Sequence, residues 1–458
     1  MAADGLSLDE LSARTGVASD DLRRWQAAGL LGASEGDGFA FEAAGRAKII
    51  ALLLRRGFDL DAVARAEAEQ PFLAYYAGRI FGDGFATAST IEEVADRVGL
   101  DPALLARIVQ AGNLGYEGGW LDAEDIQALR GMKGVIEAGL PEEAILQTIR
   151  VLADTMARAA EGTQRAFHIY VHERMRAAGM SATEATAAAG NVSQTTSAIA
   201  EPSVLYFYRK ANARALLEDM VLHAAEQAGL TDVPSVPGEI ARAIVFTDLS
   251  SFTPLTEAMG DATAAEVLER FSPLVRDAAQ RHDGRVVKQI GDGFMIVFPG
   301  AAGAIAAALD IEQGAAAEPQ FPAPRSGIHW GTVLYREGDY VGANVNVASR
   351  VQAEAQRHQI LVTAAVRGEA KRLAGVEFVR LGARRLRGVS EEMELYEAHR
   401  AGAAAAAKTI DPVCGMELGP DEVAARLTVD GVERTFCSDG CLRQFVAAPE
   451  RYPVAEPK

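Results

Sequence analysis

Two aspartates stand where an apolar segment gives way to a turn, and such positions can hold metal ions. Asp248 follows the apolar run Ala243–Phe246, and Asp292 lies in a Gly-Asp-Gly break within the segment Arg285–Phe298. This break predicts a β-hairpin with Asp292 at its tip. Lys288 lies four residues earlier and shares a strand face with the turn, so the two side chains could hold opposite ends of one ligand. An exposed turn with a surface lysine is the alternative interpretation of this segment alone.

Further polar residues follow along the chain. Asp339 lies in a glycine-flanked turn, and Asn346 and Arg350 are spaced i, i+4 in the segment that follows it. This spacing places Asn346 and Arg350 on one face of a predicted helix.

Together these segments resemble the catalytic domain of class III nucleotide cyclases, over about residues 242–399. The resemblance implies that Asp248, Asp292 and the adjoining Leu249 bind metal. It implies that Lys288 and Asp339 read the base, that Asn346 orients the ribose and that Arg350 stabilises the transferring phosphate. The remaining implied substrate-binding residues are Phe252, Thr253 and Arg387, with Arg385 as a nearby competitor of Arg387.

The chemistry of cyclisation agrees with these residue types. Two divalent ions, Mg²⁺ or Mn²⁺, can activate the ribose 3′-hydroxyl and clamp the triphosphate, and two aspartates suit such a pair. The Ser/Thr-rich turn after Asp248 begins a helix whose free N–H groups can receive phosphate oxygens. A lysine donor and an aspartate acceptor complement adenine, whereas guanine reverses both polarities. The resemblance therefore implies an ATP-using adenylate cyclase that forms cyclic AMP for signal transduction. It also implies a homodimer in which each site draws residues from both subunits.

Composition narrows the alternatives. The 458 residues are 49% hydrophobic and 24% charged, with a formal net charge of −18. This negative charge opposes non-specific binding to nucleic acid or to an anionic membrane. Neither a membrane-spanning run nor a signal peptide is apparent, so we expect a cytoplasmic protein of several domains.

The N-terminal half contains a repeat. Residues 6–65 resemble the winged helix-turn-helix of MerR-type regulators, and a second copy follows at an offset of 83 residues, with Gly99 against Gly16. One residue is lost in the wing of the second copy. We predict a first helix-turn-helix domain over residues 1–75 and a second, with further helices, over residues 88–230. The second block also resembles the helical regulatory domain that precedes some bacterial cyclase domains.

DNA binding is not expected. In the first presumed recognition helix, Asp20 and Asp21 offset Arg23 and Arg24, and the second presents only Arg107. Neither helix offers the basic face that phosphate contacts require. A metal- or stress-responsive transcription regulator therefore remains only an alternative, as does a nucleotide-binding module that has lost catalysis.

The segment before the catalytic domain is alanine-rich and predicted to be mostly helical. We expect residues 180–203 to be a weaker, mobile connection, followed by an amphipathic helix over 204–229 and a Pro/Gly boundary at 232–239. His168 and His172 are spaced i, i+4, which suits a polar helix face, a metal ligand pair or a pH sensor. The sequence does not choose among these three.

We predict the catalytic domain over residues 238–400. Strands are expected at 241–247, 285–298, 326–335 and 376–398, and helices at 261–282, from 300, and at 342–357. This order predicts an α+β, ferredoxin-like sheet with helices packed on one face.

The three cysteines all lie after residue 410. The segment around them closely resembles the YHS domain, a small treble-clef-like, metal-associated module, which we place at 408–455. Cys437 and Cys441 have C-x₃-C spacing, and Cys414 can approach them to bind Zn²⁺, Cu(I) or a similar soft ion. Reduced cysteines in a small core are the alternative. A fourth ligand is not evident; Asp411, Asp439 or water could serve. The alanine-rich linker at 401–410 predicts loose coupling to the catalytic domain.

Overall fold

The computed structural model describes residues 5–35, 38–82, 84–116, 119–229, 236–370, 373–402 and 408–452. Half of the predicted Pro/Gly boundary and half of the alanine-rich linker lie outside these residues. The chain divides into two units, Met1–Gln227 and Ala228–Lys458. Among the described residues, none of the helices is both long and apolar enough to cross a bilayer.

The N-terminal repeat is visible helix by helix. Helix α1 (Leu8–Thr15) matches α7 (Ile91–Val98), and α2 (Ser19–Ala27) matches the start of α8 (Pro102–Gly112), at the offset expected from the sequence. Both α1 and α7 begin with a capping box and end at a left-handed glycine, Gly16 or Gly99. These caps satisfy the free N–H and C=O groups at each helix end.

An isolated β-bridge also recurs. The bridge Leu6↔Phe39 in the first copy corresponds to Ser89↔Leu121 in the second, at offsets that differ by the one residue lost. Helix α2 begins at Ser19, and its N-cap is Ala18, without a side-chain cap. The other elements of the first copy and its connection are β1 (Ser34–Glu35), β2 (Gly38–Phe39), α3 (Glu42–Arg55), α4 (Leu60–Glu69), α5 (Leu73–Ile80) and α6 (Gly84–Thr87).

Long helices complete this unit: α9 (Ala123–Glu137), α10 (Glu142–Phe167), the π-helix η1 (His168–Glu173), α11 (Arg174–Ala177) and α12 (Ala182–Gln227). Helix α12 runs for 46 residues with Pro202 inside it, so the predicted mobile connection at 180–203 is wrong. Alanine, which favours helix most strongly, is abundant there. His168 and His172 stack within the π-helix with ring centroids 4.9 Å apart.

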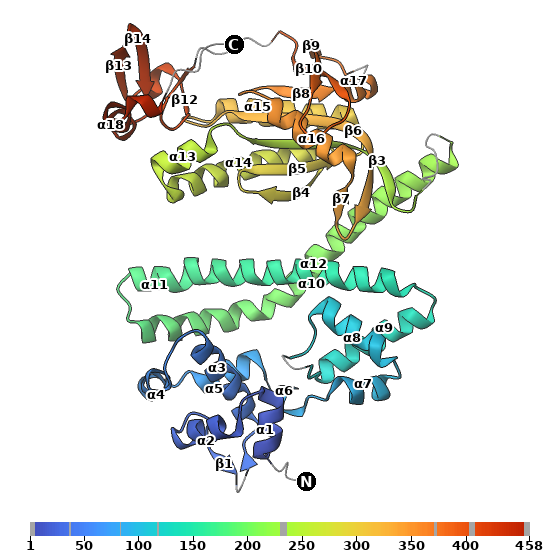
Figure 1. Cartoon of the computed structure of the whole chain (residues 1–458), viewed down its shortest axis with the longest axis vertical. Helices are drawn as coiled ribbons and strands as arrows, with labels where there is room; N and C mark the ends of the chain where they lie inside the picture. Colours follow the sequence, from blue (N-terminus) through green and yellow to red (C-terminus); the bar gives the residue numbers. More distant parts are fainter. Residues whose placement is uncertain are drawn as a thin grey trace. The chain divides into compact units, whose positions relative to one another are not determined.

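The second unit is built on an eight-stranded mixed sheet (Figure 1). Its strands, in order across the sheet, are β4 (Arg285–Ile290), β5 (Gly293–Phe298), β3 (Glu239–Leu249), β6 (Pro324–Arg336), β8 (Ile360–Thr363), β10 (Glu392–Arg400) and β9 (Val376–Arg385), with β7 (Asp339–Val341) paired to β6. All pairings are antiparallel except that between β6 and β8. The expected strands are therefore present, and β7 and β8 are additional.

Helices cover both faces of this sheet, so the expectation of one covered face is wrong. Alternate residues of β3 separate the two cores: Ala243 and Val245 pack with α14 (Asp261–Arg281) and α15 (Ala301–Ala317), whereas Ile244 packs with α16 (Ala343–Glu354). Helix α16 can approach β6 closely because Gly327 has no side chain. A Cβ at this position would lie only 2.1 Å from the backbone nitrogen of Gln352. The remaining helices are α13 (Phe252–Met259) and α17 (Ala364–Glu369).

The C-terminal module lies against α13, at one end of the sheet (Figure 1). Its elements are β11 (Thr409–Ile410), β12 (Glu417–Leu418), η2 (Pro420–Glu422), β13 (Ala425–Val429), β14 (Val432–Phe436), α18 (Asp439–Ala447) and η3 (Pro449–Arg451). Its buried residues join those of the catalytic sheet in one apolar core, which includes Phe321, Val413 and Phe436. The expectation of loose coupling is therefore wrong, because side-chain packing, not the linker, connects the two parts.

Candidate active site and cysteine cluster

The predicted metal aspartates lie next to each other. Asp292 forms the two-residue turn between β4 and β5 with Gly291, whose φ of 62° suits glycine. Asp292 Oδ2 accepts a hydrogen bond from the backbone nitrogen of Leu249 at 3.1 Å. A Cβ on Gly293 would lie 3.8 Å from the Cβ of Asp248. The hairpin tip thus faces the end of β3, and Asp292 is half-buried instead of exposed.

The charges of Asp248 and Asp292 influence each other. Burial, and then the neighbouring Asp248 carboxylate, raise the pKa of Asp292. Asp248 itself forms a two-pronged ion pair with Arg325, at 2.7 Å from Nε and 3.1 Å from a terminal nitrogen. Two converging carboxylates are a suitable donor set for hard divalent ions, so the residues present fit Mg²⁺ or Mn²⁺.

Arg325 was not found from the sequence. It lies directly opposite Asp248 because β3 and β6 pair in that register. An arginine before an apolar strand carries no signal of its own, and the register of two strands more than 70 residues apart cannot be read from local pattern.

The predicted base-reading residues also meet. Lys288 on β4 and Asp339 on β7 form an ion pair, with side chains 38% and 37% exposed. Asp339 also accepts a hydrogen bond from its neighbour Tyr340 at 2.8 Å. The pair therefore remains open to a ligand from solvent.

The other predicted substrate residues are exposed, except for the partly buried Phe252. Asn346 and Arg350 are exposed on α16, and neither side chain has a recorded hydrogen-bond or ion-pair partner within the described ranges. Arg385 and Arg387 are exposed at and just after the end of β9. Phe252 and Thr253 begin α13, preceded by Ser251 in the left-handed region with φ 62°. A single chain therefore brings Asp248 next to Asp292 and Lys288 next to Asp339. Asn346 and Arg350 contact neither of these pairs.

The three cysteines converge in the C-terminal module. Cys414 Sγ lies 3.5 Å from Cys437 Sγ, which lies 3.6 Å from Cys441 Sγ, and all three side chains are buried. Hydrogen bonds from Cys414 and then Cys437 lower the pKa of Cys441. The predicted convergence is confirmed, and thiolates so placed fit a soft metal ion.

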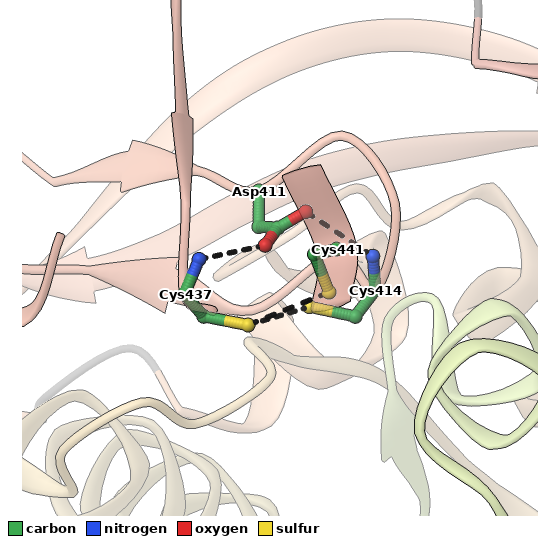
Figure 2. Close-up of side chains that lie close together, drawn as sticks. All are labelled: Asp411, Cys414, Cys437 and Cys441. Carbon is green, nitrogen blue, oxygen red and sulfur yellow. Dashed lines mark hydrogen bonds between the residues drawn. The ribbon is translucent and has the colours of Figure 1, made fainter. Parts of the chain in front are cut away.

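Asp411 accompanies them, with a ligand atom within 4.8 Å of each sulfur. Figure 2 shows its carboxylate turned toward the backbone nitrogens of Cys437 and Cys414. The distances are 2.8 Å from Cys437 and 2.8 Å from Val413, with a longer contact of 3.4 Å from Cys414. Asp439, the other candidate from the sequence, is not part of this group in the described structure.

Three family models match successive parts of the chain. The adenylate cyclase regulatory domain matches residues 26–204, the adenylate and guanylate cyclase catalytic domain matches 239–399, and the YHS domain matches 409–455. A pH-sensitive adenylate cyclase of Mycobacterium tuberculosis is 29% identical over 366 residues, which cover 78% of this chain and 88% of that protein.

A second relative from Mycobacterium tuberculosis, named only as uncharacterized, is 30% identical over 352 residues, covering 72% of this chain and 86% of its own. An adenylate cyclase structure from Trypanosoma brucei aligns at 21% identity with a TM-score of 0.34, over 39% of this chain and 93% of that one. The three family-model matches and the two Mycobacterium tuberculosis relatives show that the chain belongs to the class III adenylate cyclases, as a member with an adenylate cyclase regulatory domain and a C-terminal YHS domain.

Proposed function

We propose that the chain converts ATP to 3′,5′-cyclic AMP and pyrophosphate at two composite sites of a homodimer. The observation that carries the proposal is the placement of Asp292 at the hairpin tip, beside Asp248 at the end of β3. Two divalent ions bound there would activate the 3′-hydroxyl and neutralise the triphosphate. The regulatory domain match supports control of this activity by the N-terminal half.

The residues after Asp248 suit the triphosphate. Phe252 and Thr253 lie in the first turn of α13, where backbone N–H groups lack intrahelical partners. These groups can donate to phosphate oxygens, and the exposed Arg387 would add positive charge. Burial of the phosphates against the helix would then orient the α-phosphorus for attack.

Base choice is assigned to Lys288 and Asp339. Adenine would accept a hydrogen bond from Lys288 at N1 and donate its 6-amino group to Asp339. With guanine, the Lys288 donor would face the N1–H donor and the Asp339 acceptor would face the O6 acceptor. Such mismatched hydrogen-bonding groups are strongly disfavoured in a desolvated site. The existing ion pair supports this role, because it holds donor and acceptor side by side.

The homodimer is supported by two exposed features. Asn346 and Arg350 point away from the core of their own chain, as expected if they serve a nucleotide held by a partner's aspartates. In the other unit, α12 exposes large apolar side chains, among them Leu205, Phe207, Leu216, Leu217 and Met220. A second copy of the same helix would bury them, since symmetric self-association is the commonest assembly.

DNA binding is not part of the proposal. Arg23 pairs with Asp20 at 2.8 Å, Arg24 pairs with Asp21, and Arg107 pairs with Glu142 at 3.0 Å. These ion pairs neutralise the basic groups of the two presumed recognition helices.

Mixing two inactive full-length variants tests both the residues and the dimer. Asp248→Ala and Arg350→Ala should each be inactive on ATP with Mg²⁺ or Mn²⁺, with product identified by chromatography. After subunit exchange, heterodimers carry one intact site, so about a quarter of wild-type sites should recover. Folded, exchanging mixtures that stay inactive would exclude the composite site, and a wild type that cyclises GTP faster than ATP would exclude the assigned base.

A further inference from the structure

The cysteine cluster contacts the catalytic domain through sulfur. Cys441 Sγ on α18 lies 3.8 Å from Sδ of Met259, the last residue of α13. One turn along α18, Gln444 donates a hydrogen bond to the Ala258 carbonyl at 3.0 Å. Two adjacent contacts thus hold the cysteine-bearing helix against the end of the helix that follows Asp248.

Neighbouring sulfur atoms in this group are separated as two ligands of one ion would be. Their recorded separations are 3.5, 3.6 and 3.8 Å along the series Cys414, Cys437, Cys441 and Met259. Sulfur ligands about 2.3 Å from an ion stand about 3.8 Å apart at the corners of a tetrahedron. Each neighbouring pair is therefore close to the separation that a shared ion requires.

Asp411 is better placed as a positioning residue than as the fourth ligand. Its Oδ1 accepts from the backbone nitrogens of Val413 and Cys414, and its Oδ2 accepts from that of Cys437 (Figure 2). These bonds orient two of the cysteines and engage both carboxylate oxygens. The thioether of Met259, next to Cys441, offers a fourth sulfur donor.

We propose that Cys414, Cys437, Cys441 and Met259 form a copper(I) site that joins the YHS domain to the catalytic domain. An all-sulfur donor set with a thioether selects Cu(I), because Zn²⁺ sites use thiolate, imidazole and carboxylate ligands. The new element is Met259, a ligand that the catalytic domain itself supplies.

A cavity gives the ion a route to the cluster. It has a volume of about 510 Å³, and Met259, Met416 and Cys437 are among its lining residues. Glu266, Asp421 and Glu422 also line it. Acidic side chains at a cavity raise the local concentration of cations, and the thioethers can pass a soft ion inward to the thiolates.

The site reaches both ends of α13. At its start, Arg357 donates to Ser251 Oγ at 2.7 Å and to the Gly415 carbonyl at 2.8 Å. Gly415 follows Cys414, and a Cβ there would lie 2.6 Å from the Cβ of Ser251. An ion bound to Cys414 and Met259 would therefore fix the whole of α13 against the YHS domain. This step rests on the proposed function: α13 begins with the residues assigned to the triphosphate.

Copper binding to the reduced full-length protein tests the site without any nucleotide. Titration against a chromogenic Cu(I) chelator under anaerobic conditions should give one Cu(I) per chain, bound more tightly than Zn²⁺. Met259→Leu, which keeps the volume, should weaken Cu(I) binding about tenfold or more, and X-ray absorption should lose one sulfur neighbour. Met393→Leu, a partly buried methionine elsewhere in the catalytic domain, is the matched control.

Two results would overturn the proposal. One is unchanged Cu(I) affinity and coordination in folded Met259→Leu; the other is tighter binding of Zn²⁺ than of Cu(I) by the wild type. A second arm measures nucleotide kinetics: Cu(I) should lower the KM for ATP about fivefold in the wild type and not in Met259→Leu. An equal change of KM in the wild type and in Met259→Leu would show that α13 does not couple the copper site to nucleotide binding. Because the first arm needs no catalysis, failure of the copper site and failure of the cyclase assignment are separate results.

Discussion

The second unit carries two candidate metal sites that differ in almost every physical property. Asp248 and Asp292 offer oxygen ligands at a strand end and a hairpin tip, half-buried and beside Arg325. The cysteine cluster offers sulfur inside a core, where Cys414 and Asp411 have no exposed surface. Oxygen and sulfur donors select different ions, so both sites can be filled in one protein without competition.

The difference also separates two tasks. An open oxygen site can exchange ions together with a nucleotide, as a catalytic cycle requires. A buried sulfur site holds its ion between two packed domains and is suited to stabilising or signalling. Changes at each site should therefore have distinct consequences, and the following predictions test this separation from the largest effect to the smallest.

Asp292→Asn should break the oxygen site alone. Removing one charged ligand should lower the rate of cyclic AMP formation at least about a hundredfold, whereas the unfolding temperature and soft-metal binding stay unchanged. Asp283→Asn is the matched control, because Asp283 occupies a left-handed turn before β4 that asparagine tolerates. Retention of most activity in a folded Asp292→Asn protein would contradict the assignment.

Lys288→Glu combined with Asp339→Cys should alter nucleotide choice without affecting either metal site. The reversed polarity should lower the ratio of kcat/KM for ATP to that for GTP at least about tenfold. Each single variant should be measured beside the double variant, since the two residues pair with each other. An unchanged preference for ATP would place base reading elsewhere.

The contact between the catalytic domain and the YHS domain should depend on pH through His358. Ion pairing with Glu312, and then with the YHS residue Glu417, raises the pKa of His358 to about 9. Because this value lies above that of the unfolded chain, the stabilisation is fully present below about pH 6.5 and is lost as the pH rises through about 9. His358→Gln should weaken docking by about 2 kcal/mol at neutral pH.

Hydrogen exchange of residues 409–452 measures this effect. Wild type and His358→Gln should differ at pH 7 and converge above about pH 9.5. The control is His399→Gln, since His399 is a partly exposed histidine on β10 whose one side-chain bond among the described residues is to the neighbouring Arg400 carbonyl. A difference that persists unchanged at high pH would mean that the ion pairs do not hold the module.

Local pattern predicted the parts of this molecule that depend on neighbours in sequence. The hairpin with Asp292 at its tip follows from a Gly-Asp-Gly break, and the repeat of the N-terminal helices follows from the match of Gly99 with Gly16. Lys288 and Asp339 were paired by resemblance, and the structure brings them together. The roles of these residues in catalysis stay predictions.

Long-range contacts could not be read in this way. Arg325 meets Asp248 only through strand register, and Met259 meets Cys441 across 182 residues. Helix α12 was underestimated because small polar residues and Pro202 suggested a break. The linker before the YHS domain suggested independence, although the packing of Arg357 and His358 against that domain indicates the opposite.

The shared apolar core has a consequence for how this enzyme can be divided. Phe321 of the catalytic domain is 2% exposed, and it pairs through its backbone with Glu417 of the YHS domain. A fragment that ends at residue 400 would turn this buried seam into a water-facing apolar patch, which invites self-association. Truncation would thus make the protein more prone to aggregate, as well as smaller. Recombination that replaced the YHS domain would have to bring a matching surface with it.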